Sequence, residues 1–159
     1  MTNNWQGFTN KMLFHSRLLM EAWKEADEVA GPAFREACLG AMVQAYRSLL
    51  AEIMTNYRLS VSQPPTLDEA INSIHLKGEV SSELQYIEQL EQHESWLSSL
   101  LRSHQECLMP TQRKVLERFS GIPLVSASAM DLELPDSAAS ILVSLKELVI
   151  YSRNFSLEW

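Results

Sequence analysis

The chain has 159 residues, of which 46% are hydrophobic and 21% are charged, and its net charge at pH 7 is -7. This length fits one domain, residues 1–159, which can bury a core without a disulfide or a metal. The acidic balance speaks against general binding to nucleic-acid phosphates, which requires many Lys and Arg side chains. The start has no secretory-signal pattern, and the apolar stretch from Ile141 to Tyr151 is too short to cross a bilayer, so we expect a cytoplasmic protein without membrane contact.

The first predicted helix runs from about Asn4 to Ala30, where apolar residues recur every three or four positions. Gly31 is expected to end this helix and Pro32 to begin the next one. A link of one or two residues would then force the two helices into an antiparallel hairpin. The expected inward stripe of the first helix is Trp5, Phe8, Met12, His15, Leu19, Ala22, Ala26 and Val29.

The second predicted helix runs from Pro32 to about Leu59 with the same apolar period. The sequence SVSQPP, residues 60–65, is typical of a loop. Thr66 followed by Glu69 matches a capping box, in which each side chain binds the other residue's backbone N–H. This pair predicts a short connecting helix over Leu67–Leu76.

A third long helix is expected over Ser81–Leu108, and Pro110 ends it. From Thr111 to Pro135 the pattern is weaker and indicates a short helix through Phe119 followed by an irregular piece. A last helix is expected from Pro135 almost to Trp159. Four long helices with one or two short additional ones predict an all-α, antiparallel four-helix-type bundle.

Enzyme signatures are missing from the sequence. Cys38 and Cys107 are far apart and form no CxxC pair, so both are expected to be buried free thiols. There is no Glu-x-x-His pair, no serine nucleophile elbow and no Gly-rich phosphate loop. We therefore expect no catalytic residue, no metal and no cofactor, and the sequence favours a non-enzymatic protein.

Three polar residues interrupt the apolar stripes, and each is expected to point inward: His15, Glu94 and His104. A carboxylate beside an imidazole in a protein interior could form a polar site with shifted protonation. One hypothesis is therefore a metal- or small-ligand-binding bundle with an interior polar site. The simpler interpretation is that these side chains are hydrogen-bonded residues of the core or its rim.

Arg153 and Asn154 near the end of the last helix resemble the arginine motif of HEPN-type ribonucleases, which are small helical bundles. In that family a histidine follows the arginine at a short spacing, whereas here Leu157, Glu158 and Trp159 occupy those positions. The resemblance implies at most a degenerate, RNA-associated bundle that lacks the catalytic histidine. The alternative is an ordinary helix end.

Three stretches resemble an uncharacterised family of small helical proteins from gammaproteobacteria, known as a domain of unknown function. They are TNKMLFHSRLLMEAW at Thr9–Trp23, NYRL at Asn56–Leu59 and ESWLSSLL at Glu94–Leu101. The resemblance implies a bacterial, cytoplasmic helical bundle and no known activity, substrate or cofactor. In the opening helix it rests on Thr9, Asn10, Leu13, Phe14, Glu21, Ala22 and Trp23.

One polar face of the first helix carries Asn10, Arg17 and Glu21, and the last two residues are spaced for an ion pair at i,i+4. Together with Arg153 and Asn154, this face is a candidate partner surface. The leading hypothesis is a protein-interaction or scaffold module that associates with itself, for example as a homodimer, with proteins rather than nucleic acids as partners.

Overall fold

The computed structural model describes residues 3–110 and 132–157. Within these ranges no strand occurs, which confirms the all-α prediction, and no helix is long and apolar enough to cross a membrane. The short helix expected through Phe119 lies outside the described residues. The helices are α1 (Trp5–Glu25), α2 (Gly31–Asn56), α3 (Leu67–Leu76), α4 (Ser82–Gln92), α5 (Trp96–Cys107) and α6 (Pro135–Leu157).

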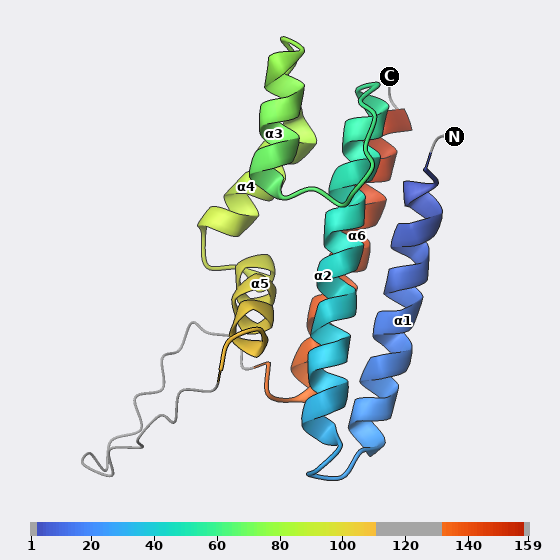
Figure 1. Ribbon diagram of the computed structural model, residues 1–159, viewed down its shortest axis with the longest axis vertical. Coiled ribbons are helices and arrows are strands. Elements are labelled where there is room, and N and C mark those ends of the chain that lie inside the picture. Colours follow the sequence, from blue (N-terminus) through green and yellow to red (C-terminus); the bar gives the residue numbers. More distant parts are fainter. Residues whose placement is uncertain (1–2, 111–131, 158–159) are drawn as a thin grey trace, which may run out of the picture.

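The helices form a bundle around α2 (Figure 1). α1 lies along one side of α2 and runs in the opposite direction, and α6 packs against both of them. α4 and α5 follow one another on the other side of α2, and α3 lies against α4. The bundle therefore has four columns, formed by α1, α2, α4 with α5, and α6, as expected from the sequence.

The hairpin of α1 and α2 has a longer link than predicted. α1 ends at Glu25 and α2 begins at Gly31, so residues 26–30 connect them, and the expectation of a one- or two-residue link is wrong. The Asp27 carboxylate accepts hydrogen bonds from two backbone N–H groups of this link, at 3.0 and 2.8 Å. These bonds hold the turn without a left-handed residue.

Gly31 does not end the first helix; it is the first residue of α2 and is buried. A Cβ at this glycine would lie 3.9 Å from Cδ1 of Trp23, which is an ordinary packing distance. Pro32 follows in the first turn of α2, where its missing N–H has no intrahelical partner to lose. Val29, expected on the inward stripe, is 89% exposed because it belongs to the link.

The buried residues of α1 are Thr9, Ser16 and Trp23, spaced seven apart. The Thr9 and Ser16 hydroxyls each donate to the backbone oxygen four residues earlier, at 3.0 and 2.7 Å. These small side chains, satisfied within their own helix, allow α2 to approach closely. Met12 and Leu19 of the predicted stripe are only partly buried beside this row. The apolar period thus located the inward side of α1, but its central row consists largely of small polar residues.

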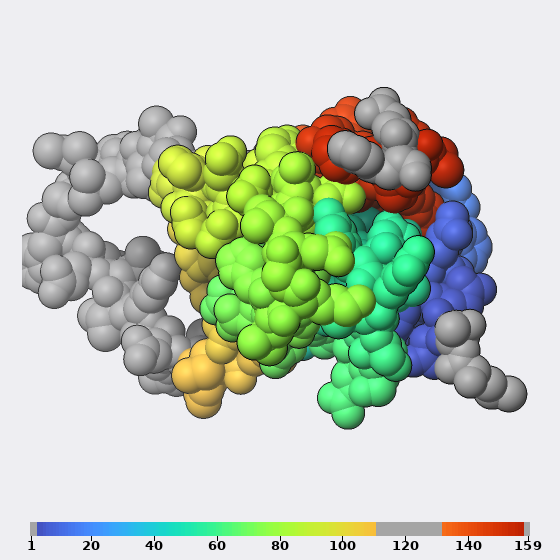
Figure 2. All heavy atoms as spheres, turned by 90° about the horizontal axis from the view of Figure 1, so that it is seen from above, coloured from blue at the N-terminus to red at the C-terminus, as the bar shows by residue number. Residues whose placement is uncertain are grey.

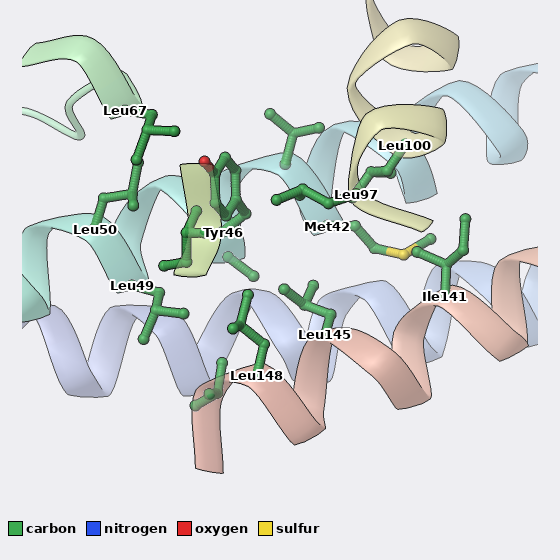
Figure 3. Packing of buried hydrophobic residues seen from close by; sticks show 14 of the residues in the cluster. Met42, Tyr46, Leu49, Leu50, Leu67, Leu97, Leu100, Ile141, Leu145 and Leu148 are labelled. Carbon is green, nitrogen blue, oxygen red and sulfur yellow. The ribbon is translucent and has the colours of Figure 1, made fainter. Parts of the chain in front are cut away.

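The core is organised around α2, most of whose residues are buried. Ala45 and Ala51 are fully buried, as expected where neighbouring helices approach closely. Figure 3 shows side chains of α2 between those of α6 and those of α5 and α3. The labelled members of this cluster are Met42, Tyr46, Leu49, Leu50, Leu67, Leu97, Leu100, Ile141, Leu145 and Leu148.

α3 has the bounds predicted from sequence, and the predicted capping box is present. Backbone N of Thr66 donates to the Glu69 carboxylate at 2.9 Å, and backbone N of Glu69 donates to the Thr66 hydroxyl at 3.3 Å. At the other end Gly78 has φ +76°, and its N–H and that of Glu79 bind the carbonyls of His75 and Ile74. This is a Schellman cap, which needs a left-handed residue after the helix.

The expected helix over Ser81–Leu108 is broken at residues 93–95 into α4 and α5. Backbone N of Ser95 donates to the Ser98 hydroxyl at 2.8 Å, and the Ser95 hydroxyl accepts from backbone N of Ser98. The Ser95 hydroxyl also donates to the Leu90 carbonyl at 2.5 Å. The side chains therefore satisfy backbone groups that a continuous helix would have paired, and α5 starts anew against α2.

Two glycine substitutions test the assignment of these helix ends. Gly31→Ala should leave stability unchanged or raise it by about 0.5 kcal/mol, because Gly31 is helical and a methyl group fits. Gly78→Ala should lower stability by about 1 kcal/mol, because its φ of +76° is left-handed. Urea unfolding followed by circular dichroism measures both. A larger loss for Gly31→Ala than for Gly78→Ala would contradict the assignment.

Candidate functional site

The three residues predicted to form an interior polar site lie in different surroundings. His15 is half-buried in the middle of α1, whereas Glu94 is exposed in the break between α4 and α5. The expectation that Glu94 points inward is wrong, because the helix that would have aimed it there is interrupted. His104 is half-buried on α5, which lies across α2 from α1 (Figure 1). Within residues 3–110 and 132–157, no three His, Cys, Asp or Glu side chains are grouped to hold a metal ion.

His104 packs against the backbone of α2. A Cβ at Gly40 would lie 3.8 Å from Nε2 of this histidine, so the missing side chain makes room for the imidazole. Burial lowers the pKa of His104, and the positive charge of Arg47 lowers it further. Both effects favour the neutral imidazole of His104, which lies beside Gly40 of α2.

The predicted polar face of α1 is present. Nε of Arg17 lies 3.8 Å from a carboxylate oxygen of Glu21, which confirms the predicted i,i+4 pair. Both side chains are at least half-exposed, so the pair contributes little to stability. Asn10 is also exposed. The Arg17 guanidinium additionally lies 5.3 Å from the ring centre of Phe14, which is itself half-exposed.

Arg153 joins three helices. Its Nε and Nη2 each lie 3.0 Å from a different carboxylate oxygen of Glu52 on α2, and Nη2 also donates to the Gln6 carbonyl of α1 at 3.5 Å. Such a two-bond contact is stronger than a single ion pair and fixes direction. Arg153 thus ties α6 to the hairpin of α1 and α2, while Asn154 beside it is exposed.

Two buried polar groups were missed by the sequence analysis because each uses residues from distant helices. Glu83, which is 3% exposed in the first turn of α4, accepts hydrogen bonds from the hydroxyls of Ser81 and Tyr57, at 2.7 and 3.3 Å. Tyr46 of α2 is 2% exposed and faces Glu91 of α4. Glu83 thereby joins α4 to Tyr57, the residue after α2, whereas the Tyr46 hydroxyl has no hydrogen-bond partner among the described residues.

Tyr46 and Glu91 alter each other's protonation. Burial raises the pKa of the Tyr46 phenol, and the negative charge of Glu91 raises it further. Burial also raises the pKa of Glu91, whereas the Tyr46 hydroxyl lowers it and Asp68 raises it.

Arg35 of α2 contacts both α5 and the residues just before α6. Its Nη1 donates to Sγ of Cys107 at 3.5 Å, and its Nε donates to the Leu132 carbonyl at 2.8 Å. Its Nη2 also lies 3.2 Å from Glu133. Cys38, as predicted, is a buried free thiol, and burial raises its pKa to about 11. Cys107 is free but only half-buried, which corrects the expectation for it.

A surface hollow of about 450 Å³ lies between the start of α1 and the loop after α2. Its polar groups are largely used within the fold: Nδ2 of Asn3 and Nε1 of Trp5 both donate to the Val61 carbonyl, at 2.9 and 3.2 Å. Arg58 is the one ionisable side chain of its lining. The hollow therefore offers no converging set of polar groups for a ligand.

The outer face of α6 carries a row of exposed apolar side chains. Val143, Ile150 and Leu157 are 56%, 59% and 82% exposed. They are spaced seven apart, so they share one side of the helix. Seen from above, α6 forms an outer edge of the molecule between α4 and α1 (Figure 2). We call these three residues the α6 row.

Aromatic side chains flank the α6 row. Tyr151 and Tyr86 of α4 are each 43% exposed, with ring centres 5.2 Å apart. Phe155 continues this group, its ring centre 6.3 Å from that of Tyr151. The sequence analysis missed both the row and its flank, although the seven-residue spacing of three apolar residues was a visible signal.

Comparison with known proteins gives a family but no activity. The sequence model of a family described as a family of unknown function (DUF6586) matches residues 1–159. No curated protein and no solved structure matches the chain significantly. The expectation of membership in a family of unknown function is thereby confirmed.

The protonation of Glu91 leads to a pH prediction. Because its pKa is raised in the folded state, its contribution to stability is fully present below the unfolded pKa and is lost as the pH rises through the folded pKa. The ionised carboxylate therefore costs stability at neutral pH. Glu91→Gln should melt at a higher temperature than the wild type near pH 7, and the difference should shrink towards about pH 4.

Thermal melts of both proteins across this pH range measure the difference. Glu94→Gln is the matched control, because Glu94 is exposed. A Glu91→Gln protein that melts below the wild type near pH 7 would show that the carboxylate is stabilised by its neighbours instead.

Proposed function

Because the chain belongs to this family of unknown function, we propose its role from geometry: a cytoplasmic, non-enzymatic interaction module that associates with itself through the outer face of α6. The observation that carries the proposal is the α6 row. Three large apolar side chains, more than half exposed and seven residues apart, leave an apolar row on one side of α6 in water. Such a surface is typical of a protein contact.

The free energy available at this face favours association. Fully burying a Val, Leu or Ile side chain contributes about 1.5–3 kcal/mol relative to exposure. The α6 row and the flanking rings of Tyr86 and Tyr151 would bury further apolar area in a dimer. Tyrosine is also enriched at protein interfaces, because its ring packs while its hydroxyl stays wet.

The same face limits the affinity. From Val143 to Leu157 the row extends about 21 Å along α6, given a rise of 1.5 Å per residue. A contact of this length is at the small end of the size range of specific interfaces. Interfaces of this small size are weak and transient. We therefore expect dissociation constants in the micromolar range, about 10–100 μM.

Other features support an interaction role over the alternatives. Two interior charged groups are engaged within the fold: Arg153 is held by Glu52, and Glu83 accepts hydrogen bonds from Ser81 and Tyr57. The net charge of -7 disfavours nucleic acid as the partner. Both cysteines are free, as is usual in a reducing compartment. A protein partner, here a second copy of the chain, accounts for the exposed apolar side chains.

Sedimentation velocity over about 5–500 μM tests the proposal, with the concentrations set around the expected dissociation constant. The wild type should shift from monomer to dimer. Ile150→Glu should weaken the dimer at least about tenfold, since it removes an apolar contact worth more than 1.4 kcal/mol and places a charge in the row.

Leu76→Glu is the matched control. Leu76 is 90% exposed at the end of α3, far along the bundle from the middle of α6 (Figure 1). This variant should dimerise like the wild type, and circular dichroism should show that both variants are folded. A wild type that stays monomeric at the highest concentration would refute self-association, and equal loss in both variants would refute the α6 face.

A further inference from the structure

We propose that two copies of the chain pair through α6 in parallel and in register, around a two-fold axis that runs along the helices. This inference rests on the proposed self-association and specifies its geometry. Two observations carry it: the seven-residue spacing of the α6 row, and the placement of Lys146 and Glu147, which are both exposed halfway between Val143 and Ile150.

The α6 row itself suits a two-stranded contact. In a parallel pair in register, each residue of the row meets its own copy, so Val143 packs on Val143 of the second chain and Ile150 on Ile150. A row repeating every seven residues keeps facing the partner when the helices cross at a small angle.

The charges decide the direction of the pair. Successive helical residues are rotated by about 100°, so Lys146 and Glu147 lie on opposite sides of the α6 row, each about 50° from it. When the two helices are related by a two-fold axis that runs along them, the Lys146 side of one helix lies next to the Glu147 side of the other. Lys146 of each copy then faces Glu147 of the second, and two opposite-charge pairs form.

An antiparallel pair would place the same charges unfavourably. When the two-fold axis runs across the helices, the Lys146 sides of both helices lie next to each other, and so do the Glu147 sides. Lys146 would then face Lys146, and Glu147 would face Glu147. It would also pair Val143 with Ile150 of the second copy instead of with itself. Like charges at these flanking positions are destabilising, and such charges set orientation in paired helices. The exposed charges therefore complement one another in the parallel pair alone.

Disulfide trapping distinguishes the two directions. In a Cys107→Ser background, Val143→Cys and Ile150→Cys are introduced singly, while Cys38 stays because it is fully buried. Under mild oxidation each single variant should form a covalent dimer with itself. Ser140→Cys is the matched control, because Ser140 is exposed on the same helix but about 70° from the row, and it should form little dimer.

Each outcome has a definite meaning. If the single variants stay uncrosslinked and only a mixture of Val143→Cys and Ile150→Cys chains is trapped, the pair is antiparallel and the inference is overturned. If the wild type dimerises in sedimentation and Ile150→Glu abolishes the dimer, but no cysteine combination is trapped, the parallel register is overturned while the proposed function stands. A monomeric wild type would overturn both.

Charge reversal gives an independent test by sedimentation. Lys146→Glu and Glu147→Lys alone each turn two attractive pairs into two repulsive ones, and each should weaken the dimer about threefold to tenfold at low salt. The double variant K146E/E147K restores opposite charges and should regain the affinity of the wild type. Single variants that dimerise like the wild type, or a double variant weaker than both, would overturn the assigned direction.

Discussion

α2 contacts each of the other five helices, and most of its side chains are withdrawn from water. The remaining helices are arranged around this one buried element, each with its apolar side turned towards it. The hydrophobic driving force of the domain is therefore concentrated along one helix. The contacts on several sides also explain why buried residues occur around much of α2, since a helix covered on several sides needs apolar or small residues all round.

Polar residues inside the bundle serve this arrangement. Arg153 holds α6 to α2 and α1, and Glu83 holds α4 to the residue after α2. Arg35 of α2 contacts Cys107 of α5 and Leu132, which lies before α6. A buried charge is costly unless it is paired, so each of these groups specifies which helices must meet. The outer face of α6, in contrast, leaves three large apolar side chains exposed in one row.

Interpretation of the candidate site from sequence succeeded and failed for identifiable reasons. His15, Glu94 and His104 were grouped because they share apolar stripes, but a stripe gives only the side of a helix on which a residue lies. The break at residues 93–95 moved Glu94 to the surface, and α2 lies between the helices of the two histidines. The α6 row was overlooked because a spacing of seven residues occurs on inner and outer faces alike.

The sequence by itself determined the helical class and the bounds of α3 with its capping box. It also determined the start of α6 at Pro135 and the pair of Arg17 with Glu21. Those features depend on residues three or four positions apart, which meet whenever a helix forms. Tertiary structure alone decided the pairing of Arg153 with Glu52, the placement of Tyr46 near Glu91, and which apolar side chains of α6 are exposed among the described residues. These depend on which helices become neighbours, and that choice is made by the burial of α2 as a whole.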